Sequence, residues 1–296
     1  MNWIQLSAIV DPTQAEALEE SLLAAGASAV TMVDAADQPI LEPALGTTPI
    51  WNETRVIGLF SAEEDIDDAQ KVARAVFTEM ASSDCPNLVA ELLENEDWTR
   101  KWIENFKPIH FGNRLCVCPS WEETPDTGAI NLLLEPGLAF GTGTHPTTAL
   151  CLEWLDATNL SEKTIVDFGC GSGILGIAAL LLGATKVIAI DNDPQALVAT
   201  RDNAERNSIK PQNIETYLPE DAPHFEADIV IANILAQPLH DLKDSILSYL
   251  KPKGSLVMSG VLSNQSEALA QKYSDQVDID PIATQENWTR VSGKRK

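Results

Sequence analysis

A run of glycines at every second position carries the sharpest chemical signal in this 296-residue chain. Residues 164–173 read TIVDFGCGSG, an apolar strand that enters a glycine-rich turn. An apolar helix is expected over 174–182, and a second strand over 186–190 ends at Asp191. Glycine lets the backbone approach a ligand closely, and an acid at that position can accept hydrogen bonds from ribose hydroxyls. The pattern predicts half of a doubly wound, nucleotide-binding α/β sheet.

Two cofactors are compatible with this turn. Residues 171–176 match the dinucleotide fingerprint GxGxxG, and Asp191 follows at the expected spacing. A longer pattern, Asp167-x-Gly169-x-Gly171-x-Gly173, resembles motif I of the class I S-adenosylmethionine-dependent methyltransferases. The longer match favours S-adenosylmethionine, and a dinucleotide-dependent enzyme is the alternative.

Two further segments place polar residues beside this turn. Asn233 ends an apolar strand over 228–232, and ligands of such sheets bind at the carboxyl ends of the strands. Residues 138–148 combine glycines, threonines and His145 ahead of an apolar helix. Thr147 or Thr148 can donate a hydroxyl to a carboxylate at that helix N-terminus, where the helix dipole also favours an anion. A simple capping turn is the alternative, and for His145 a structural role is favoured over that of a base.

Together these segments resemble one family. The stretches that carry the resemblance are 98–108, 118–121, 136–148, 167–173 and 233–236, and they are similar to the ribosomal protein L11 methyltransferases. The resemblance implies S-adenosylmethionine as the cofactor, held at Thr148, Gly169, Gly171, Asp191 and Asn233, without a metal. It also implies methylation, up to the trimethyl state, of the α-amine and lysine amines of one large-subunit ribosomal protein.

Asn233 is the predicted catalytic residue, because methyl transfer from a sulfonium needs a positioned, neutral amine. A lysine amine is neutral about one time in a thousand near pH 7.4, and an α-amine roughly a quarter of the time. The amide oxygen of Asn233 can hold the amine while it stays uncharged itself. It would therefore orient the amine without trapping the ammonium form.

The first 94 residues predict a separate small domain. Strands are expected over 4–10, 29–33, 54–60 and 88–93, with helices after Asp11-Pro12 and over 65–80. The order βαββαβ is that of a ferredoxin-like fold. Because this part shows neither a phosphate loop nor a cysteine cluster, we expect it to recognise the substrate.

A short helix is expected between the two parts, over residues 95–108. Its aromatic and apolar residues Trp98, Trp102, Ile103 and Phe106 share one face, and Pro108 ends it. The predicted organisation is thus a recognition domain over 1–94, a linker helix over 95–108 and a class I methyltransferase domain over 109–296.

The charge of the chain is strongly acidic and uneven. It carries 20 Lys and Arg against 44 Asp and Glu, a net charge of −24. Residues 1–94 hold 17 acids and 3 bases, whereas residues 109–296 hold 24 acids and 14 bases. Such a field attracts a cationic partner and repels phosphate backbones, although an acidic proteome is an alternative explanation. We expect a basic ribosomal protein as substrate, met before its assembly, and no direct contact with nucleic acid.

The remaining composition excludes several classes of protein. Five scattered cysteines indicate neither a disulfide framework nor a zinc site, and they fit a reducing cytoplasm. The first residues lack a signal-peptide pattern, and the longest apolar stretch is too short to span a bilayer. We expect a monomeric cytoplasmic enzyme. A related lysine or glutamine methyltransferase with another target, and a non-catalytic acidic escort of a basic protein, are the alternatives.

Overall fold

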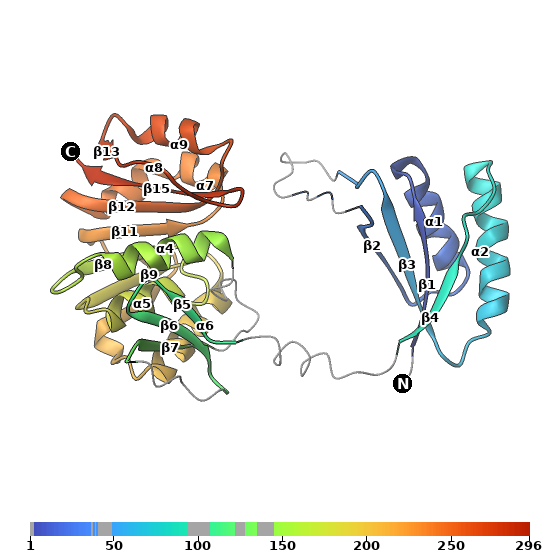
Figure 1. Ribbon diagram of the computed structural model, residues 1–296, viewed down its shortest axis with the longest axis horizontal. Coiled ribbons are helices and arrows are strands. Elements are labelled where there is room, and N and C mark those ends of the chain that lie inside the picture. The colour runs from blue at the N-terminus through green and yellow to red at the C-terminus, as the bar shows by residue number, and fades with distance from the viewer. Residues whose placement is uncertain are drawn as a thin grey trace. The chain divides into compact units, whose positions relative to one another are not determined.

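The computed structural model describes residues 3–36, 38, 40, 49–93, 107–121, 128–134 and 145–296. The chain divides into two compact units, Met1–Ile103 and Glu104–Lys296 (Figure 1). The predicted linker helix, apart from residues 107 and 108, and the loop over 136–144 lie outside the described residues. Among the described residues, no helix combines the length and the apolar character needed to cross a membrane.

The N-terminal unit is an antiparallel sheet with two helices packed against it (Figure 1). Its elements are β1 (Trp3–Val10), α1 (Pro12–Ala24), β2 (Ala29–Asp34), β3 (Thr54–Ser61), α2 (Ile66–Ala81) and β4 (Val89–Leu93). The strands lie in the order β2-β3-β1-β4, and each neighbouring pair is antiparallel. This is the ferredoxin-like arrangement that the sequence predicts.

Capping residues set the helix boundaries in this unit. The Asp11 carboxylate accepts a hydrogen bond from the backbone N–H of Thr13 at 2.8 Å, and Pro12 occupies the first turn of α1. Gly26, with φ of +98°, follows the end of α1 and allows the chain to reverse. The core between helices and sheet includes the fully buried side chains of Leu18 and Phe77.

The second unit is built on an eight-stranded sheet with helices on both faces. Its strands are β8 (Thr164–Phe168), β9 (Lys186–Ile190), β10 (Ile214–Tyr217), β11 (Ala227–Asn233), β12 (Leu250–Leu262), β13 (Val277–Ile279), β14 (Ala283–Gln285) and β15 (Trp288–Arg295). Its described helices are α4 (Pro146–Ala157), α5 (Ile174–Leu181), α6 (Pro194–Arg206), α7 (Ala236–Asp241), α8 (Lys243–Ser248) and α9 (Ser266–Tyr273), and a 3₁₀ turn lies at Pro211–Asn213. The strand order is β10-β9-β8-β11-β12-β15-β13, and β14 pairs with β15. Strands β8 to β12 pair in parallel, whereas β15 runs antiparallel to its neighbours.

Burial alternates between the two faces along each central strand. Ile165 and Val187 belong to the core that includes side chains of α4 and α5. Their neighbours Val166 and Ile188 belong to the core on the opposite face, which includes side chains of α7, α8 and α9. Strands buried on both faces are typical of a parallel sheet covered by helices. The predicted doubly wound sheet is confirmed.

A smaller three-stranded sheet, absent from the sequence-based expectations, packs on the α4 side of this core. It consists of β5 (Ile109–Phe111), β6 (Leu115–Pro119) and β7 (Ile130–Leu134). The buried carboxylate of Asp156, near the end of α4, accepts hydrogen bonds from the backbone N–H groups of Asn113 and Arg114 at 2.8 and 3.0 Å. A Cβ at Gly112 would lie 2.2 Å from that carboxylate. The β5–β6 turn is therefore anchored to α4.

Candidate active site

The predicted site residues gather at one edge of the large sheet. Gly169 follows β8, Asp191 follows β9 and Asn233 ends β11, and these three parallel strands are neighbours in the sheet. The chain continues from β8 outward to β9 and β10, then returns to the other side of β8 as β11. Ligands of open α/β sheets bind at this reversal, beyond the carboxyl ends of the strands.

The glycine turn after β8 requires glycine at its alternate positions. Gly169, Gly171 and Gly173 have φ of +75°, +54° and +78°, a region that side chains disfavour. A Cβ at Gly169 would also lie 2.3 Å from Cγ2 of Ile234. The turn is tied to the neighbouring strand, because the Gly169 N–H donates to the carbonyl of Ile190 at 2.8 Å. A ligand can therefore approach the backbone of this turn closely at the end of β8.

Asp191 holds this turn and keeps capacity to bind a ligand. Its Oδ2 accepts the backbone N–H of Gly171 at 2.9 Å, and its Oδ1 accepts the backbone N–H of Asp193 at 3.0 Å. An ionised carboxylate has about four acceptor positions, so about two remain for ribose hydroxyls. The sequence predicts that Asp191 binds the ligand. The structure shows that Asp191 also holds the glycine turn in place.

Thr148 and Asn233 meet across the same edge. Thr148 is buried in the first turn of α4, and its hydroxyl accepts a hydrogen bond from Nδ2 of Asn233 at 3.3 Å. This contact leaves Oδ1 of Asn233 buried with no hydrogen-bond partner among the described residues. A buried amide oxygen without a donor is costly unless a ligand supplies one. The geometry therefore fits a substrate N–H, while the catalytic role of Asn233 stays a prediction.

His145 caps the helix that carries Thr148. Its Nδ1 accepts the backbone N–H of Thr147 at 3.3 Å and lies 2.8 Å from the Thr147 hydroxyl. Its ring packs edge-on against Trp288, with ring centroids 4.8 Å apart. Burial lowers the pKa of His145, and the nearby Glu286 raises it in part. These contacts are structural, and they agree with the structural role that the sequence favours for His145 over that of a base.

The buried carboxylate of Asp167, in β8, anchors the start of α5 just after the glycine turn. Asp167 is 1% exposed, and its Oδ2 accepts the backbone N–H of Gly176 at 2.9 Å. A Cβ at Gly176 would lie 2.9 Å from Val187 and 3.1 Å from that oxygen, so α5 packs closely on the sheet here. Burial raises the pKa of Asp167 to about 7, the Gly176 N–H opposes the shift, and the negative charge of Asp191 adds to it.

Sequence reasoning missed two residues of α6 that hold the turn. The Thr200 hydroxyl donates to the carbonyl of Gly171 at 3.1 Å, and Nδ2 of Asn203 donates to the carbonyl of Ser172 at 2.9 Å. Both residues are buried. Their spacing of three residues places them on one helix face, and polar residues on a buried face were the available signal.

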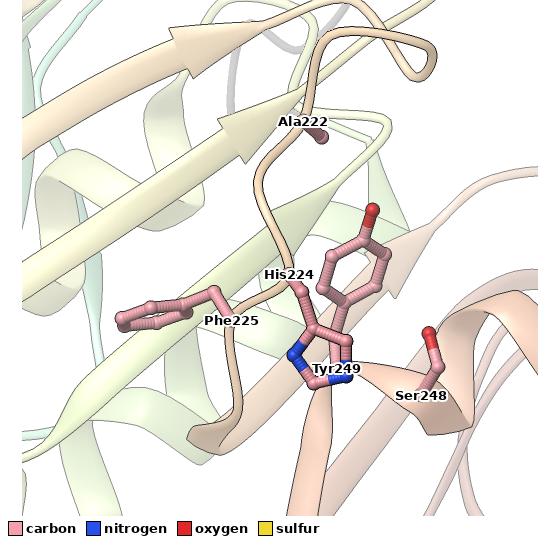
Figure 2. Close-up of a pocket in the computed structure, with 5 residues that line it drawn as sticks. All are labelled: Ala222, His224, Phe225, Ser248 and Tyr249. Atoms are coloured by element: carbon pink, nitrogen blue, oxygen red, sulfur yellow. The ribbon is translucent and has the colours of Figure 1, made fainter.

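A separate hollow of about 210 Å³ lies away from these residues (Figure 2). Figure 2 shows Ala222, His224 and Phe225 on the loop before β11, and Ser248 and Tyr249 where α8 ends. None of the predicted site residues lines it. The loop connects to the amino end of β11, so the hollow is not part of the edge where Asn233 lies.

Fold and site together define a class I S-adenosylmethionine-dependent methyltransferase. The site fits that cofactor, because the glycine turn admits close approach, Asp191 retains acceptor capacity and the N-terminus of α4 favours a carboxylate. The family model described as ribosomal protein L11 methyltransferase matches residues 2–296, and this chain belongs to that family.

Individual relatives extend over the same length. A protein of Pseudoalteromonas atlantica named ribosomal protein L11 methyltransferase is 52% identical over 100% of both chains. One of the same name from Pseudomonas aeruginosa is 50% identical, over 100% of this chain and 99% of the relative. A solved structure of ribosomal protein L11 methylase from Lactobacillus delbrueckii subsp. bulgaricus is 32% identical, with a TM-score of 0.59. It covers 64% of this chain and 100% of the other.

Proposed function

We propose that this chain transfers methyl groups from S-adenosylmethionine to ribosomal protein L11, on its α-amine and on lysine side chains, up to the trimethyl state. The observation that carries the proposal is the buried Oδ1 of Asn233, which lies beside the glycine turn and has no hydrogen-bond partner among the described residues. Full-length relatives named as L11 methyltransferases support the substrate. Methylation of amines is the chemistry that an uncharged acceptor at this place suits best.

The cofactor would be held by three parts of the catalytic edge, the edge of the large sheet where Gly169, Asp191 and Asn233 lie. Asp191 would accept hydrogen bonds from the ribose hydroxyls of the cofactor. The glycines of the turn at 169–173 would let the cofactor lie close to the protein backbone at the strand ends. The N-terminus of α4 would hold its carboxylate, with the Thr148 hydroxyl as a donor. When bound, S-adenosylmethionine supplies a methyl group that its sulfonium already activates for transfer.

Asn233 would place the incoming amine. Its Oδ1 would accept an amine N–H, and its Nδ2 is held by Thr148, so the side chain cannot turn away without losing that bond. Because the amide is neutral, it stabilises the ammonium form, which has no lone pair to react, less than a carboxylate would. Positioning of this kind can lower a barrier by roughly 7–11 kcal/mol.

The N-terminal unit would recognise the substrate. Its 17 acids and 3 bases over residues 1–94 would attract a basic ribosomal protein before assembly, when no RNA phosphate covers it. The segment over 95–108 would link recognition to catalysis. We expect the enzyme to act as a monomer in the cytoplasm, where newly made ribosomal proteins are found.

Mass spectrometry of purified L11 after incubation with the full chain and S-adenosylmethionine tests this function. We expect methyl groups on the α-amine and on specific lysines, and none with Asn233→Ala, which keeps Thr148, the glycine turn and Asp191 and should still bind the cofactor, although more weakly. A parallel reaction offers labelled cofactor to a total ribosomal protein extract. Label on a different protein would identify another target, and absence of label from every protein would contradict the function.

A further inference from the structure

A second pocket of the catalytic unit lies at the opposite edge of the sheet from the candidate active site. It has a volume of about 160 Å³ and is formed by the segment before β8, the first residues of β12 and the end of β15. Pockets that hold cofactor-sized ligands measure roughly 300–1,000 Å³. This pocket therefore suits a small ion or one group of a larger ligand.

The charge of this pocket is opposite to that of the chain. Lys163, Lys251, Lys253 and Lys294 line it, together with a single carboxylate, that of Asp228. Across residues 109–296 acids outnumber bases by 24 to 14, so four lysines against one carboxylate reverse the charge balance locally. Four lysines against one carboxylate give this concave site a net positive charge, which attracts anions.

Asp228, which carries the one carboxylate among the residues that line this pocket, already has hydrogen-bond and ion-pair partners. Oδ2 of Asp228 accepts hydrogen bonds from the backbone N–H and the hydroxyl of Thr164, both at 2.9 Å, and lies 3.2 Å from Nζ of Lys251. The other three lysines of the pocket have no salt bridge to any described residue. Among the described residues, three ammonium charges thus have no anionic partner.

An irregularity of β12 brings two of these lysines to the pocket. Ala227 pairs with Leu250 and Ile229 with Ser255, so four residues of β12, 251–254, lie opposite one residue of β11. Lys253 takes a φ of +62° there, which is uncommon for a residue with a side chain. Lys251 and Lys253 thus lie in the irregular part of β12, and both line the pocket.

Polar groups of the pocket wall add donors to the lysine charges. Nζ of Lys294 donates to Oγ of Ser255 at 2.6 Å, which leaves the serine hydroxyl hydrogen available. Asn159 uses its Oδ1 to accept the backbone N–H of Ser161 at 3.1 Å, so its amide NH₂ is a further donor. Lysines and hydroxyls together are the groups that proteins use to bind phosphate oxygens.

We propose that this pocket binds a phosphate group, either as a free phosphate or as part of RNA, and the RNA source would depart from the expectation, drawn from the net charge of the chain, that nucleic acid is not contacted. Three ammonium charges without a salt bridge to a described residue match a multiply charged phosphate better than the single charge of a carboxylate. The site is distinct from the active site, because α4 separates them: Thr148 lies in its first turn and Thr158, its C-cap, lines the pocket. Ten helical residues span about 15 Å.

Titration of the full chain with inorganic phosphate, followed by calorimetry at constant ionic strength, tests the proposal. We expect saturable binding of one phosphate per chain, weakened at least tenfold in the double variant Lys163→Gln with Lys253→Gln. The arginine pair Lys163→Arg with Lys253→Arg should retain binding. The matched control, Lys210→Gln with Lys272→Gln, removes two exposed lysines outside the pocket and should change affinity less than twofold.

Two outcomes would overturn the site: no saturable binding by the unmodified chain, or an equal loss of affinity in the control. Thermal unfolding of each variant verifies that the fold is intact. A short single-stranded RNA then distinguishes the sources of phosphate. Displacement of phosphate by RNA at tenfold lower concentration identifies an RNA backbone as the ligand, and failure to displace it identifies a free phosphate.

Discussion

The hydroxyl of Thr148 accepts a hydrogen bond from Nδ2 of Asn233 at 3.3 Å, and Oδ1 of the same amide is buried without a described partner. One end of the asparagine side chain is thereby held by the first turn of α4, and the other end is left for a donor from outside. The two residues are 85 positions apart in the chain. Their contact joins the helix that would bind the cofactor carboxylate to the strand end that would place the amine.

Replacing Thr148 by valine keeps the shape of the side chain and removes this hydrogen bond. A typical hydrogen bond contributes about 0.5–1.5 kcal/mol, so we expect kcat on L11 to fall up to tenfold as Asn233 loses its fixed orientation. Thr148→Ser retains the hydroxyl and should preserve kcat. Steady-state kinetics on purified L11 measure both variants. An unchanged kcat in Thr148→Val would show that Asn233 needs no support from α4.

Replacing Asn233 by aspartate keeps the size of the side chain and adds a negative charge. A carboxylate would stabilise the ammonium form of the substrate, which cannot attack the methyl group, and a neighbouring opposite charge can favour that form about a hundredfold, so we expect kcat to fall by about that factor. Cofactor affinity should stay constant or increase, because the sulfonium is cationic. Single-turnover methylation and cofactor titration separate the two effects. Parallel loss of cofactor binding would instead indicate a damaged site.

Replacing Asp191 by alanine should weaken binding of S-adenosylmethionine at least tenfold. Hydrogen bonds to a charged group contribute about 1.5–3 kcal/mol each, and the ribose would lose such acceptors. The backbone N–H groups of Gly171 and Asp193 also lose their acceptor, so the free energy of unfolding should fall by about 1–2 kcal/mol. Calorimetric titration and urea denaturation measure the two quantities.

A neighbouring acid provides the control for this variant. Asp193 accepts the backbone N–H of Gln195 and caps α6, so Asp193→Ala should lower stability by about 1 kcal/mol and leave cofactor affinity unchanged. Equal losses of affinity in the two variants would remove the assignment of Asp191 as the ribose ligand.

Local patterns in the sequence are sufficient to predict most of the residues at the catalytic edge. The glycine turn, the strand ending in Asp191 and the cap at Asp193 each depend on residues within a few positions of one another, and the structure places them as predicted. The N-terminal unit is similar in this respect, because Asp11 and Gly26 mark the two ends of α1. Short-range patterns of this kind are visible without knowledge of tertiary contacts.

Other parts of the fold depend on contacts between distant residues. Strands β5 to β7 have three to five residues each and give too short a pattern to recognise, and Asp156 anchors their turn from more than forty positions away. His145 and Trp288 pack together from opposite ends of the catalytic unit, so no spacing links them. The basic pocket likewise combines Lys163 with Lys294, and total charge conceals it.

The buried carboxyl of Asp167 predicts a dependence of stability on pH. Burial raises its pKa from 3.8 to about 7, so between these values the folded chain holds a proton that the unfolded chain has released. The free energy of unfolding should therefore fall as pH rises from about 4 to 7, with a slope of up to about 1.4 kcal/mol per pH unit from this group. Above pH 7 the contribution is constant.

The variant Asp167→Asn lacks this titration and isolates its effect. Urea denaturation at several pH values should show wild type losing stability relative to the variant between pH 4 and 7. Asp202→Asn changes an exposed acid of α6 and should run parallel to wild type across that range. Parallel curves for Asp167→Asn as well would show that this carboxyl is ionised at acidic pH in the folded chain.

The charge asymmetry predicts how salt changes the reaction. Residues 1–94 carry 17 acids and 3 bases, so encounter with a basic L11 molecule should be accelerated by long-range attraction. The Debye length shortens from about 30 Å at 0.01 M to about 8 Å at 0.15 M ionic strength, and the attraction should fade over that interval. We expect kcat/KM on free L11 to fall several-fold while kcat barely changes, because the bound amine is positioned at short range by Asn233. The same field should repel assembled ribosomes, so free L11 should be methylated faster than L11 in ribosomes at equal concentration. A kcat/KM that does not vary with salt would remove steering and leave the acidity of this unit without a role in recognition.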